Sequence, residues 1–489
     1  MKGPIQTTLA FATLALLAGC AVGPDYRRPV AVETMPVSYA GATNEWKLAA
    51  PAAHLLKGAW WEVFGDAELN RIEARAAEAN QQLQAAVARF EQARAAADVA
   101  RSGLFPHIGV GFSAARQRDS ANRPLPTTGE AAGKSFNYDN FVLPFDLSYE
   151  LDLWGRVRRQ IESARAAARA DAADLEAVRL VVAAEVAADY FALRALDAEI
   201  AAVRASIEAY GKALDLTRDR RAGGLASDLD VVQAQTVLNT AEAQLPALEL
   251  ARQKFQHALA MLVGQPATLF QLPPAPLNTD PPVIPAEVPS ALLERRPDVA
   301  AAEERMAAAN AAIGVAKAAF FPTVRFNGLA GLQSIDAGSL FDWPSRFWAV
   351  GPSLSLPLFD AGQRRARFRM SKAAYDETVA RYRDTVLRAF AEVEDQLAAQ
   401  RLLAAQFERE MAALASARKQ LELALNRYRS GLVSYLHVTA AQNAVLERER
   451  AVARLRGQRF AAAVAMVKSL GGGFKSESST HTAWKGETP

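Results

Sequence analysis

The sequence is poor in the residues from which disulfides and most metal centres are built. Its 489 residues include one cysteine and five histidines. A single thiol excludes an intrachain disulfide and any metal site made of several cysteines. None of the histidines has a second His or Cys at the spacing typical of metal ligands; they are His54, His107, His257, His437 and His481. We therefore expect neither a metal centre nor a catalytic site built on histidine.

Charge of one sign and long apolar runs are also lacking. The chain has 56 basic and 53 acidic residues and no basic tract, so we expect no nucleic acid as a partner. After Cys20 no run of 18 apolar residues occurs, so only strands could cross a membrane. Catalytic carboxylate pairs, nucleophile–base arrangements and phosphate-binding loops are absent. We therefore predict a protein that is not an enzyme and needs no cofactor.

The lone cysteine follows a short apolar run in Leu17-Ala18-Gly19-Cys20. This pattern is typical of bacterial lipoprotein signals, and the run is too short to span a bilayer. We predict that residues 1–19 are a signal peptide and that Cys20 carries S-diacylglycerol and N-palmitoyl groups, at the start of a lipidated segment 20–65. Ala21, in place of Asp, favours the outer membrane. The alternative is an ordinary secretory signal with a chance cysteine.

The rest of the chain is an internal repeat. Gly155 and Gly362 are separated by 207 residues, and so are Gly224 and Gly431 within similar local sequences. Phe105-Pro106 is matched by Phe321-Pro322, although nine extra residues lie in the first copy. We predict a first repeat over 66–264 and a second over 290–470, with a proline-rich equatorial linker (265–289) between them and a disordered tail (471–489).

Each repeat is predicted to contain one very long helix, over 156–222 and 363–429. In the first, apolar residues alternate at spacings of three and four, as in a coiled coil. Helices of roughly 65 residues are about 100 Å long, a length suited to a periplasmic conduit. A second helix is predicted from Leu225 to about Val263, kinked at Pro246, and another from near Ser290. The alternative is an ordinary amphipathic core helix, although such helices seldom reach this length.

Strand-like alternation lies between these helices, in hairpins over 106–154 and 322–361, with Arg116 to Lys134 as a loop. A soluble sandwich would show the same alternation. Two hairpins give four strands, which cannot close alone in lipid, whereas three copies supply twelve. The polar strand face would then line a water-filled lumen; its acidic residues are Asp146, Glu150 and Asp152.

Several longer motifs identify a family. They are Val22-Gly23-Pro24-Asp25-Tyr26, Trp60-Trp61-Glu62-Val63-Phe64, Leu292-Leu293-Glu294-Arg295-Arg296-Pro297-Asp298, Phe320-Phe321-Pro322 and Arg427-Tyr428-Arg429-Ser430-Gly431. From Cys20 to about Gly472 the chain resembles the TolC-like outer-membrane efflux proteins, in the OprM/NodT lipoprotein branch.

The resemblance implies an α+β membrane protein. Its homotrimer would form a 12-stranded transmembrane β-barrel, with four strands per protomer, continuous with a long periplasmic α-helical barrel and an equatorial domain. It implies the exit duct of a tripartite pump, in contact with outer-membrane lipid, a periplasmic adaptor (membrane fusion protein) and an inner-membrane RND-type transporter. A duct for type I protein secretion and a lipid-anchored coiled-coil scaffold without a pore remain alternatives.

The resemblance also implies roles for the turns that join the long helices to their successors. The adaptor would contact Gly223, Gly224, Leu225, Gly431 and Leu432, although these could be turn residues only. A periplasmic gate would use Asp228, Asp230, Arg220, Arg427 and Tyr435. Relatives often carry Asp at the position of Ala440, so Asp228 and Asp230 are candidates to replace it. Alternatively, both are acids favoured by a helix N-terminus.

Overall fold

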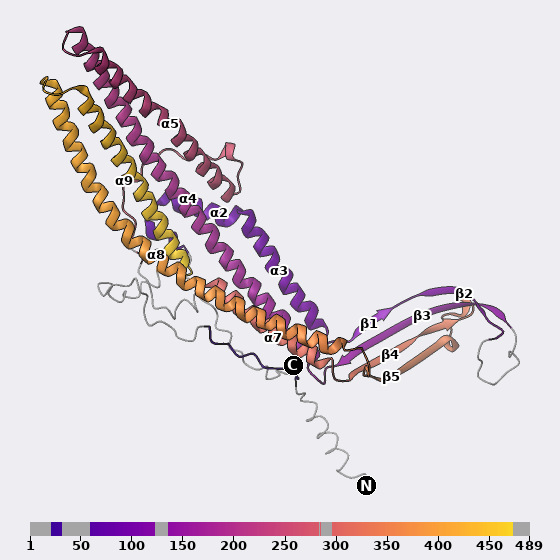
Figure 1. Ribbon diagram of the computed structural model, residues 1–489. Helices are drawn as coiled ribbons and strands as arrows, with labels where there is room; N and C mark the ends of the chain where they lie inside the picture. Colours follow the sequence, from indigo (N-terminus) through magenta and orange to yellow (C-terminus); the bar gives the residue numbers. More distant parts are fainter. Residues whose placement is uncertain (1–20, 32–58, 123–134, 283, 285–295, 473–489) are drawn as a thin grey trace. The chain divides into compact units, whose positions relative to one another are not determined.

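The computed structural model describes residues 21–31, 59–122, 135–282, 284 and 296–472 (Figure 1). Its contacts divide the chain into two compact units. The first, here called the strand unit, comprises Met1–Pro29, Glu91–Arg169 and Glu303–Ala380. The second, the helical unit, comprises Val30–Phe90, Ala170–Ala302 and Arg381–Pro489. Cys20, the signal peptide and most of the tail lie outside the described residues.

The strand unit contains one antiparallel sheet. Its strands are β1 (His107–Val110), β2 (Ser113–Asp119), β3 (Phe136–Leu151), β4 (Thr323–Ser334) and β5 (Arg346–Ser355). The order is β1-β3-β4-β5, and β2 also pairs with β3. Val110 lies opposite Phe145 and Ser113 opposite Val142, so β1 and β2 keep a single register. The sheet therefore has four strand positions, one of them occupied by an interrupted strand.

The interruption has its cause in Pro144 on β3. The N–H of Gly111 donates to the carbonyl of Pro144 at 3.0 Å, but proline has no N–H to donate in return. The pairing therefore fails at this point and resumes at β2. Because β2 extends to Asp119, the prediction that the loop begins at Arg116 is wrong: Arg116–Asp119 pair with the start of β3.

The α-helices of the described residues include two pairs of consecutive long helices, α4 with α5 and α8 with α9. The helices are α2 (Ala67–Ala79), α3 (Gln81–Ser102), α4 (Arg156–Ala222), α5 (Asp228–Leu262), α7 (Pro297–Ala318), α8 (Gln363–Arg429) and α9 (Tyr435–Ser469). Helices α4 and α8 have 67 residues each, about 100 Å, over the ranges expected from sequence. Helix α5 continues through Pro246 and begins at Asp228 rather than Leu225. In the described part of the chain, no helix combines the length and the apolar composition needed to cross a bilayer.

The largest apolar core belongs to the helical unit. Short helix η2 (Trp60–Phe64) brings aromatic rings onto α4 and α9, where Phe64, Phe191 and Phe460 pack together. The proline-rich segment after α5 is bound to the same unit by its backbone. Arg194 donates to the carbonyl of Pro273 at 2.7 Å, and Arg252 donates to that of Leu272 at 2.7 Å. These bonds hold an irregular segment against two regular helices.

Candidate functional site

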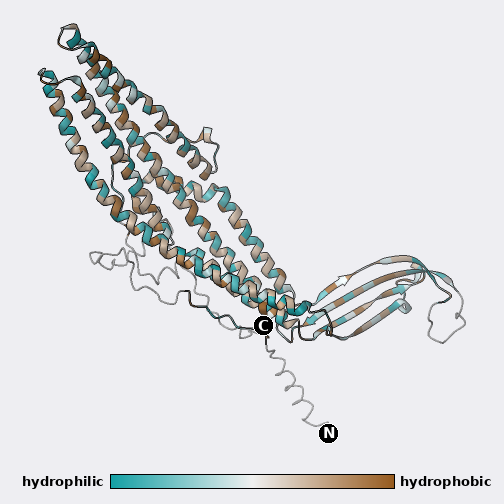
Figure 2. Cartoon of the chain, viewed as in Figure 1, coloured by the Kyte–Doolittle hydropathy of each residue, from teal (hydrophilic) through white to brown (hydrophobic). Residues whose placement is uncertain are grey.

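One face of the sheet is apolar and exposed. The register places Val110, Phe145, Ala330 and Trp348 in one row across all four strand positions. Trp348 is 77% exposed and Phe145 50%. Figure 2 shows apolar and polar residues mixed along the strands, as expected when successive side chains point to opposite faces. A large exposed apolar surface of this kind marks an interaction site for lipid or protein.

The opposite face is polar. Its rows contain Glu150, Arg325 and Ser353, then Ser148 and Asn327, then Asp146. Side chains on this face bond across the strands: Asn327 donates to Ser353 at 2.8 Å and Gln333 donates to Asn140 at 3.0 Å. A sheet with one apolar and one polar face matches the pattern of strands that separate lipid from a water-filled lumen.

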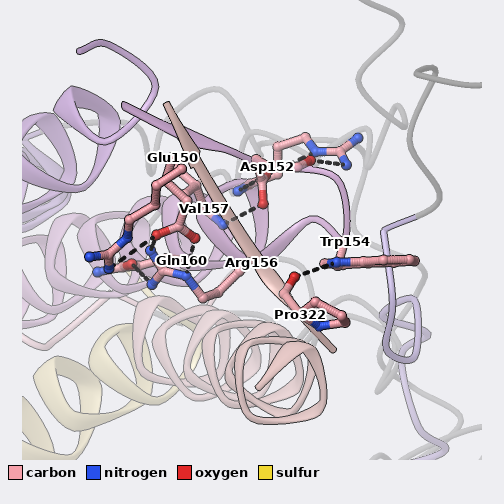
Figure 3. A network of polar contacts seen from close by, with 9 residues as sticks. Glu150, Asp152, Trp154, Arg156, Val157, Gln160 and Pro322 are labelled. Carbon is pink, nitrogen blue, oxygen red and sulfur yellow. Dashed lines mark hydrogen bonds and ion pairs between the residues drawn. The ribbon is translucent and has the colours of Figure 1, made fainter. Parts of the chain in front are cut away.

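The passage from β3 into α4 is fixed by carboxylates (Figure 3). Asp152 accepts hydrogen bonds from the N–H groups of Val157 at 3.0 Å and Arg158 at 2.9 Å, which caps the helix. This corrects the prediction for Asp152, which lies beyond the end of β3 and not on its polar face. Glu150 binds Arg156 through both oxygens, at 2.6 and 2.9 Å.

The aromatic side of the same junction joins the two hairpins. The indole of Trp154 donates to the carbonyl of Pro322 at 2.8 Å (Figure 3). Its ring stacks on that of Phe321, with 4.8 Å between ring centres. Gly155 adopts φ of 76°, a left-handed conformation that favours glycine. Strand and helix are therefore joined by a short turn that these contacts hold in place.

The segment after Cys20 also lies on the strand unit. Val22 donates to the carbonyl of Trp154 at 3.0 Å, and Asp25 pairs with the buried Arg159 at 2.7 Å. Further along, Arg28 pairs with Glu303 at 3.0 Å. These contacts place the residues next to Cys20 beside the β3–α4 junction, although Cys20 itself lies outside the described residues.

The two helix-to-helix turns have the same geometry. In both, glycine takes a φ of 73° just after the helix, at Gly224 and Gly431. The next residue bonds back across the last turn: Leu225 donates to Arg220 O at 2.7 Å and Leu432 to Arg427 O at 2.9 Å. This is the Schellman arrangement. Leu225 and Leu432 are 71% and 73% exposed. Gly223 has no positive φ, so its backbone does not require glycine.

Asp230 connects the two turns. One carboxylate oxygen accepts from the N–H and hydroxyl of Ser227, each at 2.9 Å, and the other accepts from the N–H of Tyr435 at 3.3 Å. Partial burial would raise the pKa of Asp230, but the bonds from Ser227 and Tyr435, with the charge of Arg220, lower it overall. The carboxylate therefore remains charged at physiological pH.

The other predicted gate residues are placed differently. Asp228 pairs with Arg221 on the exposed surface. Arg220 donates to the carbonyl of Arg429 at 2.9 Å, and its guanidinium lies 4.9 Å from the ring centre of Tyr428. Arg427 is exposed in the last turn of α8.

The second turn is also held by aromatic rings on the two helices that flank it. The buried Tyr435 packs edge-on against Tyr428, with 5.2 Å between ring centres. The structure thus brings together Asp230, Arg220 and Tyr435. It adds Tyr428, which sequence reasoning named only as part of a turn motif. The sequence could have pointed to Tyr428, because this residue lies about one helical turn before Gly431.

The arginine of the predicted family motif is a structural anchor. Arg296 is buried and pairs with Asp298 at 2.7 Å and Glu392 at 2.6 Å, and it donates to the carbonyl of Ser469 at 3.1 Å. It therefore ties the start of α7 to α8 and to the end of α9. The preceding part of the motif, 292–295, lies outside the described residues. Among the described residues, no three His, Cys, Asp or Glu side chains gather as metal ligands would.

Comparisons with known proteins agree with this geometry. The family model described as outer membrane efflux protein matches residues 74–265 and 288–472. Outer membrane protein OprJ of Pseudomonas aeruginosa is 33% identical over 482 residues, covering 97% of each chain. The toluene efflux pump outer membrane protein TtgF of Pseudomonas putida is 32% identical, covering 96% of this chain and 98% of its own. The solved structure of the outer-membrane channel OprN superimposes with a TM-score of 0.84 at 30% identity, over 93% of this chain and 99% of that one.

The two-faced sheet and long helices define an outer-membrane channel subunit. The chain belongs to the outer membrane efflux protein family, as the resemblance implied. Its location is the outer membrane and its function is efflux through a channel. The relatives named here are channel and efflux proteins rather than enzymes, and none is named as a secretion duct or a scaffold.

Proposed function

We propose that this protein is the passive exit duct of a tripartite efflux system, active as a homotrimer whose three sheets close into one 12-stranded barrel. The observation that supports this most is the sheet itself. It has an exposed apolar face, a polar face, and two edges, at β1/β2 and at β5, that have no partner strand among the residues that the structure describes. Backbone groups cannot remain unpaired in lipid, so closure between protomers satisfies both edges.

The long helices complete the duct in this proposal. A length of about 100 Å carries α4 and α8 from the barrel through the periplasm, where three protomers would assemble a helical barrel with an equatorial domain. The two sequence repeats supply equivalent hairpins and turns, as the matched φ of 73° at Gly224 and Gly431 supports. Acyl chains on Cys20 would anchor the chain near the β3–α4 junction, where Val22 and Asp25 are held.

The turns at the far end would dock onto a periplasmic adaptor served by an inner-membrane RND-type pump. Exposed leucines support this: Leu225, Leu432 and Leu229 are 71%, 73% and 64% exposed. Apolar side chains held out by rigid turns form suitable contacts for a partner. Asp230, Arg220 and Tyr435 would hold the resting duct closed. TtgF is named as part of a toluene efflux pump, and small toxic compounds of this kind are the cargo class that we propose for this protein.

The proposal is tested by reconstitution of the purified, detergent-solubilised protein. Native mass spectrometry should give three chains per particle, and planar bilayers should show stepwise currents. A cell lacking its own exit duct should regain efflux only when this protein, its adaptor and its pump are all present. A monomer without current, with folding confirmed by circular dichroism, would refute the proposal.

A further inference from the structure

Between Asp146 and Glu150 of β3, the polar face of the sheet carries charges at two separate levels, whereas Asp119 lies on the same face much further along, opposite Phe136. At the helix-proximal level, Glu150 lies opposite Arg325. At the second level Asp146 lies opposite Leu329. The two levels are four residues apart on β3, about 13 Å along the strand. This separation exceeds the screening length of about 10 Å in 0.1 M salt, so each level acts largely on its own.

The first level has an excess of positive charge. Glu150 is bound by Arg156 through both oxygens, and Arg325 approaches it at 3.8 Å. One carboxylate therefore faces two guanidinium groups. The Glu150 side chain is 15% exposed, whereas that of Arg325 is 57% exposed. The charge that reaches solvent at this level is therefore mainly that of Arg325.

The second level is negative. Asp146 is exposed and is flanked across the strands by Gly109 and Leu329. A Cβ at Gly109 would lie 2.6 Å from a carboxylate oxygen of Asp146, so the absence of a side chain there leaves room for the carboxylate. Among the described residues, no Arg, Lys or His forms an ion pair with Asp146. Within that part of the chain, its charge is therefore not compensated by a paired cation.

We propose that Asp146 and Arg325 set the charge selectivity of the duct, with Asp146 favouring cations and Arg325 opposing them. This inference rests on the proposed closure of three sheets with their polar faces inward. Closure places three carboxylates at one level of the lumen and three exposed guanidinium groups at the other. Rings of Asp or Glu select cations and rings of Arg or Lys select anions in other pores. The carboxylates of Asp146 would favour the passage of solutes that carry a positively charged amine.

The test is the reversal potential of single channels in a KCl gradient. Asp146→Asn should shift the permeability ratio towards chloride, and Arg325→Gln should shift it towards potassium, each by about twofold or more in about 0.1 M salt. The shifts should shrink in concentrated salt, because screening weakens fixed charges. Arg346→Gln is the matched control. Arg346 shares a face with Trp348, on the apolar side, so its loss should leave the ratio unchanged.

A second variant guards against a folding defect. Channels of the Asp146→Cys variant are first shown to conduct and are then treated with a thiol reagent that carries a sulfonate. This treatment should restore the cation preference. The same variant treated with a reagent carrying a quaternary ammonium should move further towards chloride. If the variant channels conduct but substitution of Asp146 and of Arg325 leaves their permeability ratio unchanged, this inference is wrong and the proposed exit duct still stands. A folded wild-type protein that passes no current would overturn the proposed function and this inference with it.

Discussion

The carboxylate of Asp230, near the start of α5, accepts a hydrogen bond from the backbone N–H of Tyr435, the first residue of α9, at 3.3 Å. Ser434 precedes α9 but makes no side-chain cap. Asp230 therefore caps two helices at once, its own and that of the other repeat. The residue 207 positions later is His437, so the second repeat offers no equivalent carboxylate. The carboxylate link between the turns thus depends on Asp230 alone, beside the bond that Arg220 donates to the carbonyl of Arg429.

Loss of this link should open the resting duct. We expect Asp230→Ala to increase single-channel conductance and vancomycin uptake, because Tyr435 N–H and the Ser227 cap lose their acceptor. Asp228→Ala should have little effect alone, since exposed ion pairs such as Asp228–Arg221 contribute about 0–1 kcal/mol. The double variant should leak about as much as Asp230→Ala. Equal behaviour of the two single variants and wild type in both assays would refute a gating role.

The link should also respond to acid in a defined direction. The pKa of Asp230 is lowered in the folded protein from its usual 3.8, so the contribution of its charge is present above that value. It is lost only as pH falls through the lower, folded pKa. We therefore expect unchanged conductance from pH 8 to 5, measured in planar bilayers. Asp230-dependent opening already at pH 6 would contradict this assignment.

Glu73 on α2 should make the protein less stable as pH rises. The side chain is 2% exposed, one of its oxygens has no hydrogen-bond partner, and burial raises its pKa to about 9. A raised pKa means that its stabilising contribution is complete below about 4.5 and declines up to about pH 9. Glu73→Gln should remove this decline, so that the Tm difference from wild type grows with pH.

The exposed Glu78 on the same helix supplies the control for that measurement. Glu78→Gln should leave the pH dependence of Tm as in wild type. If Glu73→Gln and Glu78→Gln give the same slope between pH 5 and 9, Glu73 is ionised in the folded protein and the prediction fails.

Arg296 should be required for the packing of α7 on its neighbours. Arg296→Ala removes donors from Asp298, Glu392 and the buried Ser469 carbonyl, and should cost about 1–3 kcal/mol. Arg296→Lys keeps the charge but cannot reproduce the guanidinium fork, so it should rescue only partly. Thermal unfolding in detergent measures both. If Arg296→Ala has the Tm of the wild-type protein, these contacts do not contribute to its thermal stability.

The exposed leucines of the turns should matter for the adaptor and not for the channel. We expect Leu225→Asp with Leu432→Asp to abolish co-purification with the adaptor and to abolish efflux in cells. The turn backbone does not depend on these side chains, so the purified variant should keep its trimer mass and its conductance. Retained adaptor binding would exclude these residues from the interface.

Local sequence was sufficient for the long helices and for the turns that end them. The bounds of α4 follow from helical periodicity between Gly155 and Gly224, and those of α8 from the same separation between the matching glycines Gly362 and Gly431. Periodicity and turn glycines are local signals, so no tertiary information is needed.

Long-range pairing could not be obtained in the same way. Pro144 interrupts a strand more than 30 residues earlier, and only the register shows that Gly111 lies opposite it. Asp152 belongs to the alternating pattern by sequence, yet it turns to cap α4 because β3 ends one residue before it. Likewise, Asp230 and Tyr435 are 205 residues apart.

The current through planar bilayers containing the purified protein tests the central claim most directly, because it requires sheets from several protomers to close around water. We predict stepwise currents whose ion preference changes in opposite directions with Asp146→Asn and Arg325→Gln. Folded protein in the bilayer that leaves the current at the level of bare lipid would contradict it.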